Sequence, residues 1–194
     1  MKIIELTQQK NERKTGEHCE YIEPNVTEDS IFYVDGKAIG FYLAKMPEKM
    51  CNLANLSNAE FRSKNVPKSL MERNKPMGKD ESGKYKYVTV QQYSTILGSI
   101  PPKPVMRREY PTKSSVHASK TAQTFIKSML LLAIESEQLI KEILPEQYER
   151  QIELFKDVPD KWKFGNLFTS SISNFNIPAA FHIDNGNIKG TVNV

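Results

Sequence analysis

The chain has 194 residues and a formal net charge of +4, and apolar residues make up 39% of it, a low share for a globular domain. This length suits one domain, or one and a part, with a modest core that needs no disulfide framework. The longest apolar run, from Met129 to Ile134, is too short for a membrane span, and the amino terminus lacks the apolar centre of a signal peptide. With Cys19 and Cys51 as its two cysteines, the protein is expected in a reducing cytoplasm.

The charge is distributed unevenly along the chain. The segment from Arg62 to Lys113, called the basic block below, holds twelve Lys or Arg and four Asp or Glu, a net +8, so the rest of the chain sums to −4. Such a block indicates a polyanionic partner, and it is equally compatible with a solvated surface segment. Four tyrosines lie between these charges, where they either stack on nucleic-acid bases or pack within strands; they are Tyr85, Tyr87, Tyr93 and Tyr110.

In the amino-terminal half, the first thirty residues are polar and irregular, and we expect a weakly structured arm there. Residues 31–43 predict a β-hairpin, because Asp35-Gly36 tolerates the positive φ angles of a two-residue turn. The expectations that follow along the chain are a helix over 50–61, a second helix over 65–73, a loop over 75–84, a strand over 85–90, a helical or extended segment over 91–100 and an extended segment over 101–111.

The carboxy-terminal half begins with the clearest helix. Apolar residues recur every three or four positions over 119–144, which is the pattern of one helix face. Pro145 ends this helix and can open the next, predicted over 146–157. Residues 167–175 are rich in Thr, Ser and aromatic residues and predict a strand, turn residues fill 176–187, and 188–194 predict a final strand.

His182 and Asp184 are the candidate metal ligands. Because one residue separates them, their side chains point to the same side of an extended segment. An imidazole and a carboxylate suit Fe(II) or another borderline divalent ion, and a second His would complete a two-His-one-carboxylate face. The spacing alone also fits a surface His bonded to a turn Asp. A strand before the pair, and a Gly/Asn loop leading into a strand after it, favour the metal site.

The stretch from Phe168 to Asn176, followed by His182-Ile-Asp-Asn-Gly-Asn-Ile-Lys-Gly-Thr-Val-Asn-Val, resembles the Fe(II)/2-oxoglutarate-dependent dioxygenases. The resemblance is closest to the TET/base-J-type nucleic-acid oxygenases found in bacteriophages, and it covers about residues 164–194. It implies that His182 and Asp184 bind Fe(II), that Asn174 lines the 2-oxoglutarate pocket and that Asn187 shapes the loop beside it. It also implies hydroxylation of a nucleic-acid base, a pyrimidine 5-methyl group, which must leave the helical stack to be reached.

The fold class expected from this resemblance is α+β, with a helical support layer followed by the first strands of a double-stranded β-helix, or jelly roll. Residues 1–115 would form a basic amino-terminal region, and 116–194 two support helices plus the start of the oxygenase core. The family's distal His and its basic 2-oxoglutarate clamp have no counterpart after position 182. We therefore expect an incomplete jelly roll, explained by truncation, and little 2-oxoglutarate turnover by these residues alone.

Two alternatives to truncation would also account for the missing ligands. A partner chain could complete the sheet, which would make the protein a structural subunit. The fold could also serve as a non-catalytic phage-type module that binds nucleic acid through the basic block, or binds a protein. In each case the expected location is the cytoplasm, that of the host cell if the chain is phage-encoded, with no membrane partner.

Overall fold

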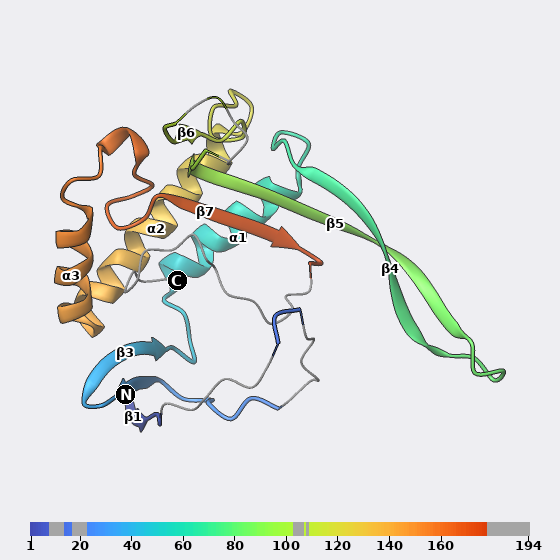
Figure 1. Cartoon of the computed structure of the whole chain (residues 1–194), viewed down its shortest axis with the longest axis horizontal. Helices are drawn as coiled ribbons and strands as arrows, with labels where there is room; N and C mark the ends of the chain where they lie inside the picture. The colour runs from blue at the N-terminus through green and yellow to red at the C-terminus, as the bar shows by residue number, and fades with distance from the viewer. Residues whose placement is uncertain (8–13, 17–22, 103–106, 108, 178–194) are drawn as a thin grey trace.

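The structure is a computed structural model, and it describes residues 1–7, 14–16, 23–102, 107 and 109–177 (Figure 1). Over these residues the fold is mixed α/β, with three α-helices and two sheets and no closed barrel, so the predicted jelly roll is not confirmed. The elements in chain order are β1 (Lys2–Glu5), β2 (Ser30–Val34), β3 (Lys37–Tyr42), α1 (Glu48–Arg62), β4 (Ser69–Lys79), β5 (Tyr85–Ile100), β6 (Thr112–Lys113), α2 (Gln123–Ile143), α3 (Pro145–Phe155), the 3₁₀ helix η1 (Asp160–Trp162) and β7 (Ser170–Phe175).

The amino-terminal sheet has the strand order β1-β2-β3. Its hairpin confirms the prediction, since Asp35 and Gly36 both have positive φ angles, of 50° and 72°. The expectation of a weakly structured arm was wrong for Lys2–Glu5, which pairs in parallel with β2 and places Ile3 opposite Ile31. Parallel pairing depends on a partner strand far along the chain, so local composition does not reveal it.

The second sheet is built around β5, which pairs with β4, β6 and β7, in each case antiparallel. The helix predicted over 65–73 was wrong, because Ser69–Lys79 forms a strand instead. The loop predicted over 75–84 is shortened to the turn 80–84 by the same strand. Pairing with the Tyr-, Val- and Thr-rich β5 supplies β4 with a ladder, and such tertiary context overrides weak local helix propensity.

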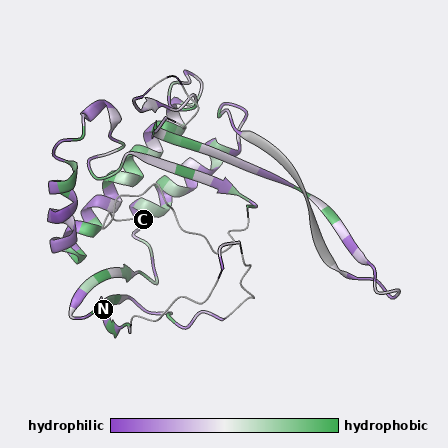
Figure 2. Ribbon diagram, viewed as in Figure 1, coloured by the Kyte–Doolittle hydropathy of each residue, from purple (hydrophilic) through white to green (hydrophobic). Residues whose placement is uncertain are grey.

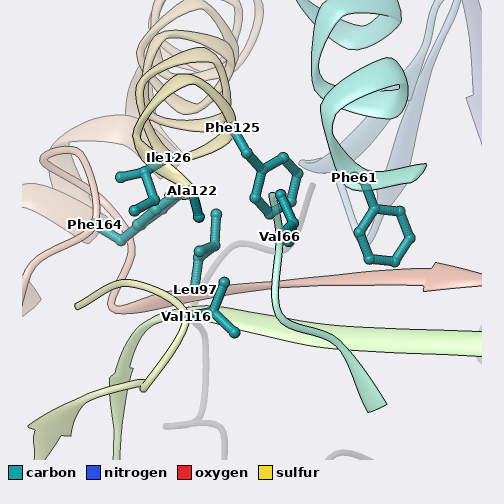
Figure 3. Packing of buried hydrophobic residues seen from close by; sticks show 8 residues of the cluster. All are labelled: Phe61, Val66, Leu97, Val116, Ala122, Phe125, Ile126 and Phe164. Atoms are coloured by element: carbon teal, nitrogen blue, oxygen red, sulfur yellow. The ribbon is translucent and has the colours of Figure 1, made fainter. Parts of the chain in front are cut away.

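Helices α1 and α2 cover one face of this sheet and form the main core with it (Figure 3). The rings of Phe61 and Phe125 stack between the two helices with their centroids 5.8 Å apart. Nearby, the buried Ser57 hydroxyl donates to Ser128 Oγ at 2.8 Å, so the helices also meet through a satisfied polar contact. The buried members of this cluster are Phe61, Val66, Leu97, Val116, Ala122, Phe125, Ile126 and Phe164.

A second cluster joins the end of α2 and α3 to the amino-terminal sheet. Leu144 and Leu167 are buried here, and Phe41 of β3 packs against them. Gln147 Nε2 donates to the backbone oxygen of Ala38 at 3.0 Å, which links α3 to β3. Figure 2 shows purple and green stripes along the helices, the pattern of amphipathic helices that bury one side. The predicted division into 1–115 and 116–194 stays a prediction.

The confirmed helices match their sequence signals closely. The periodic segment 119–144 contains α2, and Pro145 ends α2 and begins α3 at its first position. The helix predicted over 50–61 corresponds to α1, and the strand predicted over 167–175 contains β7. Among the described residues, no helix combines the length and the apolar character needed to cross a lipid bilayer.

Candidate functional site

The predicted metal ligands His182 and Asp184 lie outside the described residues, as do Asn187 and the final strand predicted over 188–194. Their placement on iron therefore stays a prediction. Among the residues that the structure describes, no group of three or more His, Cys, Asp or Glu side chains could hold a metal ion. The site is accordingly built from β7, the last described strand before these residues.

A buried carboxylate fixes the loop from which β7 emerges. Glu137 of α2 is only 2% exposed, and its Oε1 accepts hydrogen bonds from the backbone N–H groups of Asn166 and Leu167, at 2.5 and 3.0 Å. Its Oε2 accepts from Asn166 Nδ2 at 2.8 Å. Gly165 follows Phe164 with a φ of +73°, and a Cβ at this glycine would collide with the same carboxylate. Helix α2 thus positions the start of β7 through three hydrogen bonds.

The two faces of β7 have different surroundings. Phe175 stacks on Tyr93 of β5 with the ring centroids 5.4 Å apart, and both rings pack against the core beneath the sheet. The alternate residues Ile172 and Asn174 lie on the opposite face, away from the helices. There Asn174 Oδ1 accepts a hydrogen bond from Ser94 Oγ at 2.9 Å. The predicted pocket residue Asn174 therefore lies on the helix-free face, where a bound molecule or a second sheet has access.

Apolar side chains are also exposed on this helix-free face. Ile96 and Ile172 are directly opposite each other in the β5–β7 register and are 38% and 59% exposed. Ser94 and Asn174 lie beside them, so this face carries both apolar and polar side chains. An antiparallel sheet with one face on the core commonly has its other face in solvent.

His117 is held by contacts with β5 and with Phe164. Its Nδ1 accepts the backbone N–H of Gly98 at 3.1 Å, and its ring contacts the edge of Phe164 at a centroid distance of 6.0 Å. Burial lowers the pKa of His117, and the positive charge of Lys113 lowers it further. A neutral imidazole is the form that can accept the Gly98 hydrogen bond, so the pKa shift and the geometry agree.

The basic block is divided between packed and exposed positions. Lys68 Nζ donates to backbone oxygens at the end of α1 and lies over the rings of Phe61 and Tyr93, at 5.5 and 5.8 Å. Burial lowers the pKa of Lys68. Tyr93 therefore packs within the fold, which was one of the two roles predicted for the four tyrosines. Tyr85, Tyr87 and Tyr110 are exposed instead.

Several exposed residues of the block lie at the end of the hairpin of β4 and β5, around the turn 80–84. Asp80 stabilises this turn, because its Oδ1 accepts hydrogen bonds from the hydroxyl and the backbone N–H of Ser82 and from the backbone N–H of Lys84. The Ser82 hydroxyl and then the Lys84 N–H lower the pKa of Asp80. Sequence reasoning missed the hairpin because it assigned β4 to a helix and a loop. The strand predicted over 85–90 is confirmed as part of β5, so it was the partner strand β4 that was missed.

Comparisons of the chain with protein-family models, with curated proteins and with solved structures found no match. The resemblance to the 2-oxoglutarate oxygenases therefore stays a prediction from the sequence.

Proposed function

We propose that this chain supplies the helix-backed sheet and two iron ligands of an Fe(II)/2-oxoglutarate-dependent oxygenase acting on a nucleic-acid base, with a pyrimidine 5-methyl group as the target. The observation that carries the proposal is the position of β7. This strand pairs with β5 in the sheet that α1 and α2 cover, and it ends at Phe175, seven positions before His182. In the sequence, the segment with the His-x-Asp spacing therefore comes shortly after a strand of the sheet that the helices cover.

The two faces of this sheet support the proposal. A double-stranded β-helix consists of two sheets packed face to face, so a sheet that contributes to one needs an apolar face for its partner sheet. In the proposal, the exposed Ile96 and Ile172 contact this partner sheet, and Asn174 is a polar group beside them.

The donor chemistry of the two ligands fits a ferrous ion. In the proposal, His182 contributes a neutral nitrogen and Asp184 an oxygen, and two such ligands leave coordination positions for 2-oxoglutarate and dioxygen. The iron and 2-oxoglutarate supply the oxidising power for hydroxylating a C–H bond, while the protein binds and orients the reactants. Asn174, held by Ser94, is a hydrogen-bonding group on the face where 2-oxoglutarate would bind.

The test is an anaerobic titration with Fe(II), or with Co(II) as its spectroscopic substitute, in the presence of 2-oxoglutarate. Weak binding is expected, because two protein ligands leave the ion largely hydrated, and each of His182→Ala and Asp184→Ala should weaken it at least about tenfold. His18→Ala is the matched control, since it removes an imidazole that the proposal does not use. Unchanged metal binding in both ligand variants, or an equal loss in His18→Ala, would overturn the proposal.

A second candidate function is nucleic-acid binding without catalysis. The observation that favours it is the exposed combination of Lys79, Tyr85 and Tyr87 on the hairpin of β4 and β5. The metal titration separates the two functions, because a binding module would bind oligonucleotides with full affinity and would give no response to Fe(II) that depends on His182 or Asp184.

A further inference from the structure

Beyond the register of β7, strands β4 and β5 form a two-stranded arm, defined here as residues 72–91. Strand β7 pairs with β5 between Tyr93 and Gly98, whereas β4 pairs with β5 out to Tyr85. The arm therefore has no third strand among the described residues, and Figure 1 shows it projecting away from the helices. An isolated two-stranded ribbon is only marginally stable in water, so binding a partner would add to its stability.

One face of this arm presents aromatic rings to solvent. Tyr85 and Tyr87 are separated by one residue in β5, so their side chains lie on the same face, and they are 53% and 61% exposed. Their ring centroids are 6.3 Å apart. Lys79 of β4 lies directly opposite Tyr85, with its Nζ 5.1 Å from the centroid of that ring. We call this combination of two rings and one cation the tyrosine face.

The charge of the surroundings selects a polyanion as the partner. The arm itself holds five Lys or Arg and three Asp or Glu, a net +2, and it belongs to the basic block, which carries a net +8. Lys79 and Lys84 flank the turn at the tip. The Asp80 carboxylate between them accepts three hydrogen bonds within the turn, and the exposed Glu81 adds a second negative charge there. Aromatic rings beside lysines are the combination that proteins use to hold nucleic-acid strands.

The spacing of the rings favours a single strand over a duplex. Successive nucleotides in one strand of a duplex rise by about 3.4 Å, and their base faces are covered by neighbouring bases. The two tyrosine rings are 6.3 Å apart, a separation that suits unstacked bases with accessible faces. A duplex presents only base edges in its grooves, and edge recognition would make no use of ring stacking.

We propose that the tyrosine face binds single-stranded nucleic acid, with Tyr85 and Tyr87 stacking on bases and Lys79 and Lys84 contacting phosphates. This inference rests on the proposed function and deepens it, because it names the form of nucleic acid that the protein holds and the element that holds it. For an enzyme that modifies a base, a strand that is already unstacked removes the cost of extruding the target.

The test is fluorescence anisotropy with a labelled oligothymidine of about 16 nucleotides, the upper size of a typical single-strand site. Stacking contributes about 1–3 kcal/mol per base, so the variant with both Tyr85→Ala and Tyr87→Ala should bind at least about 30-fold more weakly. The variant with both Tyr85→Phe and Tyr87→Phe keeps the rings and should bind within about threefold of the unaltered protein. Equal affinity in the alanine and phenylalanine variants would overturn the proposal.

Val88→Ala is the matched control, since Val88 is an exposed residue of the same strand on the opposite face. It should leave the affinity unchanged. Lys79→Gln offers a readout that does not depend on removing a ring: the slope of log K against log salt should fall by about 0.7, the share of one phosphate contact to a single strand. Tighter binding of a duplex of the same length, with no effect of the tyrosine variants, would also contradict the inference.

The binding assay is performed without iron and without 2-oxoglutarate, which keeps it separate from the metal titration. His182→Ala and Asp184→Ala should bind the oligonucleotide as the unaltered protein does. If these variants lose metal binding and no form of the protein binds the oligonucleotide, only the proposal for the tyrosine face is refuted. Tyrosine-dependent oligonucleotide binding with no specific metal binding would refute the oxygenase proposal alone.

Discussion

Glu137 offers the sharpest test of how the fold positions β7. Its carboxylate is buried in α2 and accepts hydrogen bonds from two backbone N–H groups and one side-chain amide, all within Asn166 and Leu167. Replacement by alanine would leave the buried Leu167 N–H without an acceptor, together with the two donors of the exposed Asn166, which water can reach. Each unsatisfied buried donor costs about 1–3 kcal/mol, and water entering the gap recovers part of this. We therefore expect Glu137→Ala to lower the free energy of unfolding by about 2–4 kcal/mol.

Glu137→Gln should have a smaller effect than the alanine variant. The glutamine oxygen can keep both backbone donors, and the Asn166 amide can rotate to accept from the new NH₂ group. Only the strengthening that a charged acceptor gives is then lost, about 1–2 kcal/mol. Glu142→Ala is the matched control, because Glu142 is exposed on the same helix and should change stability by no more than about 0.5 kcal/mol.

Urea unfolding followed by far-UV circular dichroism measures these differences, and the fluorescence of Trp162 reports on the segment just before the loop. A loss of this size is a large part of the roughly 5–15 kcal/mol that typically stabilises a domain. Hydrogen exchange at the amides of Asn166 and Leu167 should accelerate in Glu137→Ala. If Glu137→Ala unfolds within about 1 kcal/mol of Glu142→Ala, the carboxylate does not hold this loop, and the reasoning is refuted.

The pKa of His117 is lowered in the folded state, so the unfolded state binds more protons near the ordinary pKa of about 6.5. The stability that neutral His117 contributes is therefore present above that pH. It is lost as the pH falls through the folded-state pKa. The urea midpoint should therefore drop between about pH 7.5 and 5. His117→Asn should show a smaller drop, because its Oδ1 can still accept the Gly98 N–H and does not titrate. An identical pH dependence in the two proteins would show that His117 does not cause the drop. Gly98→Ala should cost about 3 kcal/mol or more, because Gly98 has a φ of +85° and a Cβ there would lie 2.7 Å from the Ser170 Cα. Gly40→Ala, whose Cβ would meet only the Phe32 ring at 3.8 Å, should change the unfolding free energy by less than about 1 kcal/mol, and similar values for both glycines would show that the β5–β7 contact is not tight.

Local signals in the sequence predicted several elements of this protein correctly. The periodicity over 119–144 predicted α2, since an amphipathic pattern of that length fits only a helix face. Asp35-Gly36 predicted the β2–β3 turn because those residue types tolerate positive φ angles. For the candidate site, the sequence singled out Asn174 on its strand together with His182 and Asp184, and the placement of the last two on iron stays a prediction.

Contacts between distant residues decided the rest, and composition could not reveal them. Strand β4 exists because β5 lies beside it, and its own residues had suggested a helix and a loop. The position of Asn174 on the helix-free face depends on the β5–β7 register, in which its partner Ser94 lies 80 positions earlier in the chain. Glu137 holds a loop about 30 positions away, and only the folded chain brings its carboxylate to those N–H groups. Local propensity is set by neighbours within a few residues, whereas pairing and burial depend on which segments meet, and that is determined by the fold as a whole.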